Sequence, residues 1–214
     1  MLDEKGFDLW ADQYDKAVGL SDEGNVYPFA GYRKVLGTVF RIIMEKPGAV
    51  VLDLGFGTGT LTTRLYENGC TIYGQDFSAR MIELSSGKMP EARLYQGDLA
   101  QGLVEPLQAQ RYDFIVATYA LHHLTDEEKV KLLKDLRGRL NPGGQILIGD
   151  IAFADREKLE RCRRDVGDEW DDEEIYAVAD ELKAYFPTLA FTQISSCAGI
   201  LSMSVQAPDR ENKE

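Results

Sequence analysis

The stretch Val50–Leu61, with the sequence VVLDLGFGTGTL, restricts the possible folds of this chain more than any other feature. A short apolar run contains Asp53, and three glycines at alternate positions then lead into a helical pattern. This order is typical of a buried parallel strand that enters a tight turn and a helix N-terminus. Glycine is needed where the backbone turns with positive φ or lies against a ligand. The stretch therefore predicts a strand and a ligand-binding turn.

The rest of the chain predicts more strand–helix units of the same sheet. Apolar runs predict strands over 49–54, 71–75, 93–96, 112–118 and 145–151, and alternation predicts a hairpin over 191–205. Helical spacing and capping residues predict helices over 60–68, 125–140, 155–166 and 173–186, and another that starts at Ser78. The stretch 100–111 is expected to be irregular. The pattern predicts an α/β fold: a Rossmann-like, seven-stranded, mostly parallel sheet with helices on both faces and a C-terminal β-hairpin.

Two amphipathic helices are expected before the sheet. Residues 3–18 place apolar side chains, Tyr14 among them, at helical spacing. A second helix is expected to begin near Pro28, which suits a first helical turn, and to end near Met44. We expect one domain over 1–207, made of an N-terminal helical cap (1–46) and a Rossmann-like core (47–207), with a flexible tail over 208–214.

Composition narrows the possible partners. The formal net charge of −12 disfavours nucleic acid, because a non-specific binder needs a basic face to neutralise phosphates. No apolar run reaches the length of a membrane span, and the polar N-terminus is unlike a signal peptide. Cys70, Cys162 and Cys197 are isolated, which predicts a reducing compartment and neither a disulfide framework nor a metal site. We expect a cytoplasmic protein, monomeric or homodimeric, without nucleic-acid or membrane partners.

Four polar side chains, Asp53, Asp76, Asp98 and Thr118, fall at or near the carboxyl ends of predicted strands. In such sheets the ligand binds outside these ends. Asp76 follows Gly55 by about 20 residues, the spacing at which a carboxylate after the second strand binds a ribose diol. The three acids predict a ligand with hydroxyl groups, amine donors or positive charge.

Two classes of ligand compete for this edge. Dinucleotide-binding turns use G-x-G-x-x-G, whereas this chain has Thr60 where the third glycine of that pattern belongs. Asp53 beside the turn disfavours a pyrophosphate and favours a cation. S-adenosylmethionine carries a sulfonium, an ammonium group and a ribose, and it has no phosphate.

At these residues the chain resembles the class I S-adenosylmethionine-dependent methyltransferases, from Phe7 to Val205. Residues 7–15 are similar to the cap of a small, largely uncharacterised bacterial subgroup that is thought to methylate small molecules. Phe56 departs from the family, in which Cys, Pro or Ala is commoner. The motifs that carry the resemblance are VLDLGFGTG (51–59), GQDFS (74–78), GDL (97–99), YDFIV with ALHHL (112–116 and 120–124) and LNPGG (140–144).

The resemblance implies a role for each candidate residue in binding S-adenosylmethionine. Gly55 and Gly57 let the backbone lie against the methionine moiety, and Asp53 helps to fix its amino group. Asp76 binds the ribose hydroxyls, and Phe77 flanks the adenine. The remaining implied contacts come from Asp98 to the adenine amine, Leu99 beside the adenine, Thr118 at the methionine end, and Tyr14 from the cap to the carboxylate.

Structural alternatives stand beside these roles. Asp53 can cap the turn or the following helix, and Asp76 can be a helix-capping acid beside Ser78. Tyr14 lies on an apolar helix face and can pack in the core. His122 and His123 invite assignment as a general base, since histidine titrates near neutrality, but they can equally brace the loop in which they lie.

The resemblance implies transfer of a methyl group to a small-molecule acceptor by in-line displacement, with S-adenosylhomocysteine as product. A general base is needed only where the acceptor starts protonated, so the sequence leaves the catalytic residues open, with His122, His123 and Tyr27 as candidates. One alternative is a non-catalytic regulatory module that binds S-adenosylmethionine. The other is an NAD-dependent oxidoreductase, which Thr60 and Asp53 disfavour.

Overall fold

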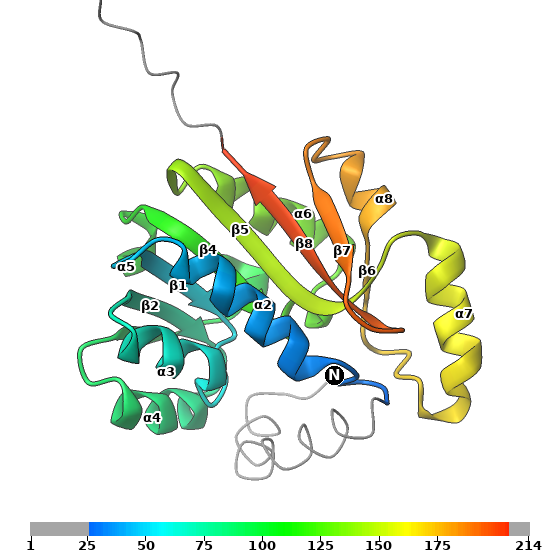
Figure 1. Cartoon of the computed structure of the whole chain (residues 1–214), viewed down its shortest axis with the longest axis horizontal. Helices are drawn as coiled ribbons and strands as arrows, with labels where there is room; N and C mark the ends of the chain where they lie inside the picture. Colours follow the sequence, from blue (N-terminus) through cyan, green and yellow to red (C-terminus); the bar gives the residue numbers. More distant parts are fainter. Residues whose placement is uncertain (1–25, 206–214) are drawn as a thin grey trace, which may run out of the picture.

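A computed structural model describes residues 26–205, which form an eight-stranded sheet with helices on both faces (Figure 1). The strand order is β3-β2-β1-β4-β5-β8-β7, with β6 paired to β5 beside this path. Strands β1 to β5 pair in parallel, and β8 runs antiparallel to both its neighbours. The strands are β1 (Val50–Leu54), β2 (Thr71–Asp76), β3 (Arg93–Gln96), β4 (Tyr112–Thr118), β5 (Leu140–Phe153), β6 (Ala177–Val178), β7 (Ala190–Gln193) and β8 (Ala198–Ser204).

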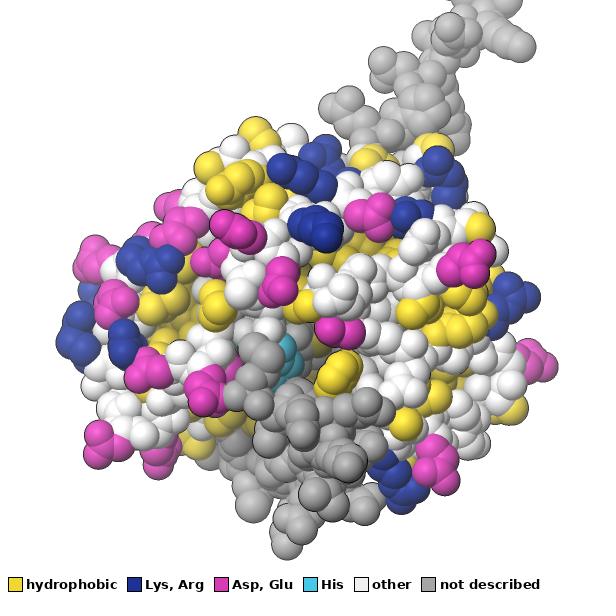
Figure 2. Space-filling view, turned by 180° about the vertical axis from the view of Figure 1, so that it is seen from behind, with side chains coloured by type: hydrophobic (Ala, Val, Ile, Leu, Met, Phe, Trp, Pro, Cys, Tyr) yellow, Lys and Arg dark blue, Asp and Glu magenta, His cyan; other side chains and the backbone are white. Residues whose placement is uncertain are grey.

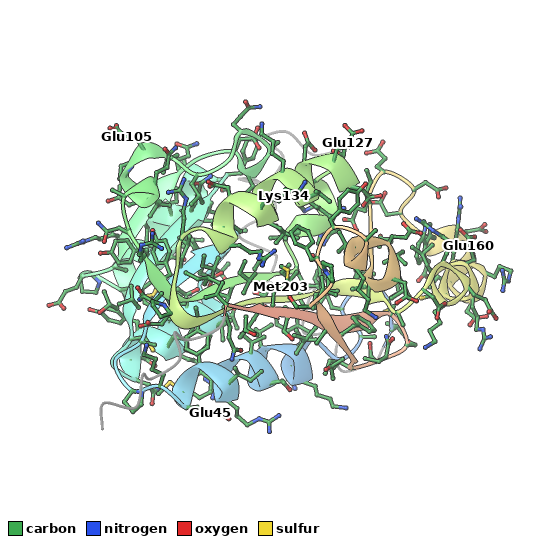
Figure 3. The ribbon with its side chains drawn as sticks, turned by 90° about the horizontal axis from the view of Figure 1, so that it is seen from above. Glu45, Glu105, Glu127, Lys134, Glu160 and Met203 are labelled. Carbon is green, nitrogen blue, oxygen red and sulfur yellow. The ribbon has the colours of Figure 1, made fainter. Side chains whose placement is uncertain are left out.

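The helices divide between the two faces of the sheet. Side chains of α2, α3 and α7 join one hydrophobic core, and those of α5, α6 and α8 join a second core on the opposite face. Figure 3 shows α2 and α6 on opposite sides of the sheet. The helices are α2 (Tyr32–Met44), α3 (Thr60–Glu67), α4 (Ala79–Lys88), α5 (Glu105–Gln108), α6 (Asp126–Arg137), α7 (Arg156–Val166) and α8 (Ala179–Lys183), with 3₁₀ turns η1 (Leu99–Gln101), η2 (Leu121–His123) and η3 (Gly167–Glu169).

The predicted α/β class, the parallel core and the C-terminal hairpin are confirmed, and the strand count is corrected from seven to eight by β6. The predicted capping residues also hold. The Ser78 hydroxyl accepts from the backbone N–H of Met81, and Thr125 and Glu128 form a capping box. The helix predicted over 3–18, with Tyr14, lies outside the described residues, as does the tail. Within residues 26–205 no helix is long and apolar enough to cross a membrane.

The helix predicted over 173–186 is wrong. Only α8 is helical there, and β6 precedes it. The buried Lys129 donates from Nζ to the carbonyl of Ile175, and the N–H of Ile175 donates to the carbonyl of His122. These long-range hydrogen bonds occupy backbone groups that a helix would need, so tertiary contacts override the helical spacing.

Three smaller expectations also differ from the structure. Pro28 lies in a turn, and α2 begins at Tyr32 after Gly31, whose φ is 78°. The helix predicted to reach residue 140 ends at Arg137, and Leu140 instead pairs with Tyr112 as the first residue of β5. The stretch 100–111, expected to be irregular, contains α5 and part of η1.

Gly74 makes room for Phe56, the residue that departs from the family pattern. A Cβ at Gly74 would lie 2.7 Å from the Phe56 ring and 2.9 Å from the Leu94 side chain. We expect Gly74→Ala to lower the free energy of unfolding by about 1–3 kcal/mol through overpacking, measured by urea denaturation. Phe56→Leu should recover part of this loss in the Gly74→Ala background. Gly87→Ala is the control, because a Cβ at Gly87 would meet nothing within 4 Å. This substitution should not destabilise α4.

Candidate functional site

The turn between β1 and α3 contains three glycines in the left-handed region. Gly55 has φ 68°, Gly57 has φ 56° and Gly59 has φ 78°. A Cβ at Gly55 would lie 2.4 Å from the Cβ of Ala120, so the turn sits tightly against the loop after β4. A Cβ at Gly57 would meet nothing within 4 Å. The backbone at Gly57 therefore borders open space at the carboxyl end of the sheet.

Asp76, the last residue of β2, binds the turn from the neighbouring strand. Its Oδ2 accepts from the N–H of Gly57 at 2.8 Å, and its Oδ1 accepts from the N–H of Ser78 at 2.9 Å. The side chain is 7% exposed. Ser78, and not Asp76, is the N-cap of α4. The carboxylate thus connects the turn after β1 to the segment that starts α4.

Asp53 is buried beneath the same turn. Its Oδ2 accepts from the Thr62 hydroxyl at 2.6 Å, whereas its Oδ1 has no hydrogen-bond partner within the described part of the chain. Burial raises the pKa of Asp53 from 3.8 to about 7, despite the hydrogen bond from Thr62. An unpartnered carboxylate oxygen in such a place is costly unless a ligand supplies a donor or a positive charge.

The other predicted residues lie along the same edge. Asp98 lies two residues after the end of β3 and caps η1, where its Oδ1 accepts from the N–H of Ala100 at 2.9 Å. Thr118 ends β4 and pairs with Gly149 of β5. Phe77, Asp98, Leu99 and Thr118 are all partly exposed. Because the parallel strands end at one edge, the structure brings the predicted residues of β1 to β4 to a single rim.

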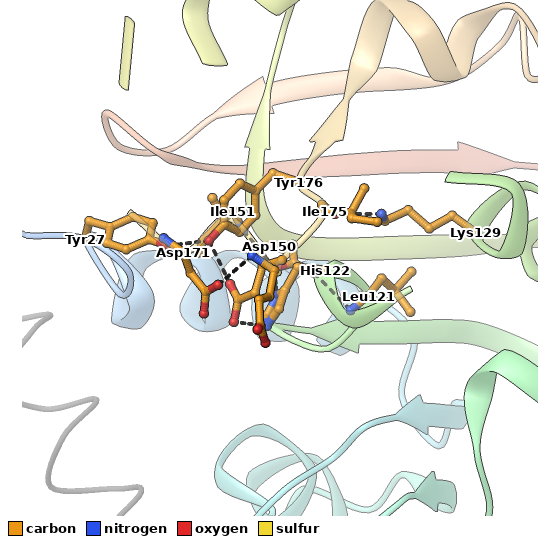
Figure 4. A network of polar contacts seen from close by, with 11 residues as sticks. Tyr27, Leu121, His122, Lys129, Asp150, Ile151, Asp171, Ile175 and Tyr176 are labelled. Atoms are coloured by element: carbon orange, nitrogen blue, oxygen red, sulfur yellow. Dashed lines mark hydrogen bonds and ion pairs between the residues drawn. The ribbon is translucent and has the colours of Figure 1, made fainter. Parts of the chain in front are cut away.

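A second group of polar residues lies where β4 and β5 end. Nδ1 of His122 and Oδ1 of Asp150 are 2.6 Å apart, and both side chains are buried (Figure 4). The other nitrogen, Nε2, lies 3.6 Å from Oε1 of Glu174. His123 adjoins them, with its ring centroid 4.2 Å from that of His122. On the face drawn in Figure 2 a histidine side chain reaches the surface, and these two are the only histidines of the chain.

The two histidines have opposite electrostatic environments. Burial alone would lower the pKa of His122, but the charge and hydrogen bond of Asp150 and the charge of Glu174 raise it above its usual value. Burial, with the neighbouring His122, lowers the pKa of His123 to about 3. The carboxylate of Asp150 has a lowered pKa, because His122 and the N–H of Ile151 outweigh its burial.

Tyr27, the third catalytic candidate, belongs to the same network. Its hydroxyl bonds to that of Tyr176, which donates to Oε2 of Glu174 at 2.8 Å. The Tyr27 ring stacks on Trp170 with centroids 5.4 Å apart. Sequence reasoning missed Glu174 and Tyr176, because it placed both in a helix and no local motif marks them.

A cavity of about 500 Å³ adjoins Tyr27 on the side of α7. Its wall combines the basic residues Lys158 and Arg161 with the acidic Asp165 and Glu169. The thiol groups of Cys162 and Cys197 also contribute to the lining. This volume falls within the range of small-molecule sites.

Comparison with known proteins gives the family. Residues 51–144 match the methyltransferase domain family. An uncharacterised methyltransferase of Geobacillus thermodenitrificans is 38% identical over 195 residues, which cover 87% of each chain. One from Anoxybacillus flavithermus is 42% identical over 154 residues, 72% of this chain and 69% of that protein.

Two solved structures share the fold. The complex of DhpI with S-adenosylhomocysteine has a TM-score of 0.67 at 17% identity and covers 94% of both chains. The magnesium protoporphyrin IX methyltransferase ChlM of Synechocystis PCC 6803, with bound S-adenosylhomocysteine, has a TM-score of 0.65 at 19% identity and covers 82% of this chain and 84% of that one.

The fold and its glycine turn are those of a Rossmann-like cofactor-binding protein. The sequence identity to the bacterial relatives identifies the family within that class. The chain belongs to the class I S-adenosylmethionine-dependent methyltransferases. The recognition made from the sequence is confirmed, as are methyl transfer as the reaction and S-adenosylmethionine as the methyl donor. Neither the NAD-dependent oxidoreductase nor the regulatory module is favoured.

The raised pKa of Asp53 predicts a pH-dependent stability. Between the unfolded pKa of 3.8 and the folded pKa of about 7, the folded state binds the proton more tightly, so stability falls as pH rises. From pH 5.5 to 7 the ligand-free protein should lose on the order of 2 kcal/mol relative to Asp53→Asn. Denaturant unfolding of both proteins across this range measures the difference. Parallel pH profiles would contradict the assignment of this titration to Asp53.

Proposed function

We propose that the rim formed by β1 to β4 holds S-adenosylmethionine and that the acceptor is a small molecule. The unpartnered Oδ1 of Asp53, buried near the end of the strand that leads into the turn, carries this proposal, together with the open space at Gly57. The site offers a cation an uncompensated carboxylate oxygen, and the backbone at Gly57 leaves room for a ligand. When bound, S-adenosylmethionine supplies an electrophilic methyl group on a sulfonium, which a nucleophile displaces in line. The residues present fit this donor.

The roles we propose follow the chemistry of each residue. Gly55 and Gly57 let the methionine moiety approach the backbone, and Asp53 accepts from its ammonium group. Asp76, which also accepts from two backbone N–H groups, accepts from the ribose hydroxyls. The proposed contacts to the rest of the donor come from Phe77 and Leu99 beside the adenine, Asp98 to the adenine amine, Thr118 at the methionine end, and Tyr14 of the N-terminal segment.

Positioning is the main contribution that this chain must make to the reaction. A sulfonium is a good leaving group, so alignment of acceptor, methyl group and sulfur accounts for several kcal/mol, as it does in other oriented reactions. The rigid connection of the turn to β2 through Asp76 serves that alignment. His122, His123 and Tyr27, the catalytic candidates, belong to one network at the ends of β4 and β5, beside Thr118.

Two features support a small-molecule acceptor. The cavity between Tyr27 and α7 has a volume of about 500 Å³, which suits a ligand of modest size. Its wall carries both basic and acidic side chains, so it favours a polar or zwitterionic compound over a purely apolar one. Tyr27 links this cavity to Glu174 through Tyr176.

We also propose a cytoplasmic protein that is monomeric or homodimeric. The three cysteines are free thiols and buried, which suits a reducing compartment. Among the described residues, Val26 and Tyr185 are the large apolar side chains that stand exposed, and such scattered exposure does not require an extensive interface.

Calorimetric titration and a turnover assay test the function. We expect S-adenosylhomocysteine to bind with one site per chain and NAD not to bind. With S-adenosylmethionine and a small-molecule fraction of a bacterial extract, the protein should produce S-adenosylhomocysteine above a protein-free control. Binding without turnover in any fraction would favour the regulatory module, and binding of NAD instead would favour the oxidoreductase.

Asp76→Ala should weaken S-adenosylhomocysteine binding by about 1–3 kcal/mol, because two hydrogen bonds to the ribose are lost. Asp113→Ala is a matched control. Asp113 is also buried and accepts from Lys46, Val50 and Asn141, but as the second residue of β4 it lies at the opposite, amino-terminal end of the strand. The control should lose stability and keep its affinity for S-adenosylhomocysteine. Unchanged affinity in Asp76→Ala would refute the ribose assignment.

A further inference from the structure

Both histidines of the chain and one glutamate converge at the carboxyl ends of β4 and β5. One ligand atom from each of His122, His123 and Glu174 lies within 4.8 Å of the others. We propose that these three side chains bind a divalent transition-metal ion of the zinc class. The ligands come from η2 and from the segment before β6, and none of them belongs to the glycine turn.

The separation of His122 and Glu174 suits a shared ion better than a direct bond. Nε2 and Oε1 are 3.6 Å apart, beyond a normal hydrogen bond. Ligand atoms at about 2.0–2.1 Å from a tetrahedral zinc ion lie roughly 3.4 Å from each other. A small adjustment of His123 completes a three-ligand arrangement, since its ring already contacts that of His122.

Asp150 orients His122 in the way that a hydrogen-bonded carboxylate orients a metal-binding histidine without touching the metal. Its Oδ1 bonds to Nδ1 at 2.6 Å and also accepts from the N–H of Ile151, while its Oδ2 accepts from the N–H of Leu121. The imidazole is thereby fixed with Nε2 directed toward Glu174. A carboxylate behind the ligating imidazole is the recurrent support of zinc sites.

Glu174 is held in place by contacts that leave Oε1 for the ion. Tyr176 donates to Oε2 at 2.8 Å, so the tyrosine fixes one oxygen and the other faces His122. The chain segment that contains Glu174 is fixed by two hydrogen bonds at the next residue, Ile175. The carbonyl of Ile175 accepts from Lys129, and its N–H donates to the carbonyl of His122. The two chain segments that supply the ligands are therefore joined directly (Figure 4).

The donor set selects the class of ion. Two imidazoles and one carboxylate suit zinc and neighbouring transition metals, whereas magnesium and calcium prefer all-oxygen sites. Three protein ligands leave coordination positions open, as in catalytic zinc sites. A consequence for the acceptor follows if the proposed function holds. We infer that the acceptor would coordinate the ion through a hydroxyl or thiol group, which would give its proton to solvent. Its oxygen or sulfur is then a nucleophile at neutral pH.

Metal binding is tested on the full-length chain with any affinity tag removed and with metal stripped by a chelator. Titration with Zn²⁺ should give one site per chain. Glu174→Gln and His123→Ala should each weaken Zn²⁺ binding at least tenfold, and Asp150→Asn should weaken it by about 10–100-fold. Asp168→Asn is the matched control, since it removes an exposed acid of the neighbouring η3 and should bind as the wild type does.

Co²⁺ identifies the ligands independently of affinity. The absorption of bound Co²⁺ should show nitrogen and oxygen ligation without a thiolate charge-transfer band, which excludes binding through the three cysteines. Thermal unfolding of each metal-free variant confirms that it is folded. Absence of stoichiometric Zn²⁺ binding, a thiolate spectrum, or wild-type affinity in both Glu174→Gln and His123→Ala would overturn the proposal.

The same samples separate this inference from the proposed function. S-adenosylhomocysteine should bind equally to the wild type, Glu174→Gln and His123→Ala, because the glycine turn and Asp76 do not contact the ion. Zn²⁺ binding without S-adenosylhomocysteine binding would overturn the proposed function and leave the metal site standing. The reverse result would overturn the metal site alone.

Discussion

The two backbone hydrogen bonds that Asp76 accepts are the interaction on which the cofactor rim depends. They join Gly57 in the turn after β1 to Ser78 before α4, across two neighbouring parallel strands. The turn has three glycines at positive φ, whose backbone needs a restraint beyond the packing of Phe56 against Gly74. A buried carboxylate at the end of β2 supplies that restraint. The residue proposed to bind the ribose therefore also shapes the surface proposed to bind the methionine moiety.

The donor side of the site was predictable because its signals are local. The glycines after β1, the acids that end β1 and β2, and the caps at Ser78 and Thr125 each act within a few residues. Parallel strands then bring these local features to one edge without further information. The packing of Phe56 against Gly74 was not predicted. The large side chain in the turn fits because the facing position of β2 has no Cβ.

The network that we propose to meet the acceptor could not be predicted, because contacts between residues distant in sequence build it. Apolar residues over 173–186 do recur at helical spacing. The backbone at Ile175 is not helical, however, because it hydrogen-bonds to Lys129 and to the carbonyl of His122. Glu174 and Tyr176 reach the histidines only through this conformation. The predicted alternative for the histidines, that they brace the loop after β4, is compatible with the His122–Asp150 contact. It does not by itself explain the second carboxylate, Glu174, whose Oε1 faces Nε2 at 3.6 Å.

The family match covers residues 51–144, which include the glycine turn, Asp76, Asp98 and both histidines but neither Asp150 nor Glu174. Membership of the methyltransferase family therefore identifies the methyl donor and the fold. The network that we propose to meet the acceptor is completed by the end of β5 and by the segment before β6, which lie beyond residue 144. A metal ion at His122, His123 and Glu174 would join two residues inside the region that matches the family model to one beyond it.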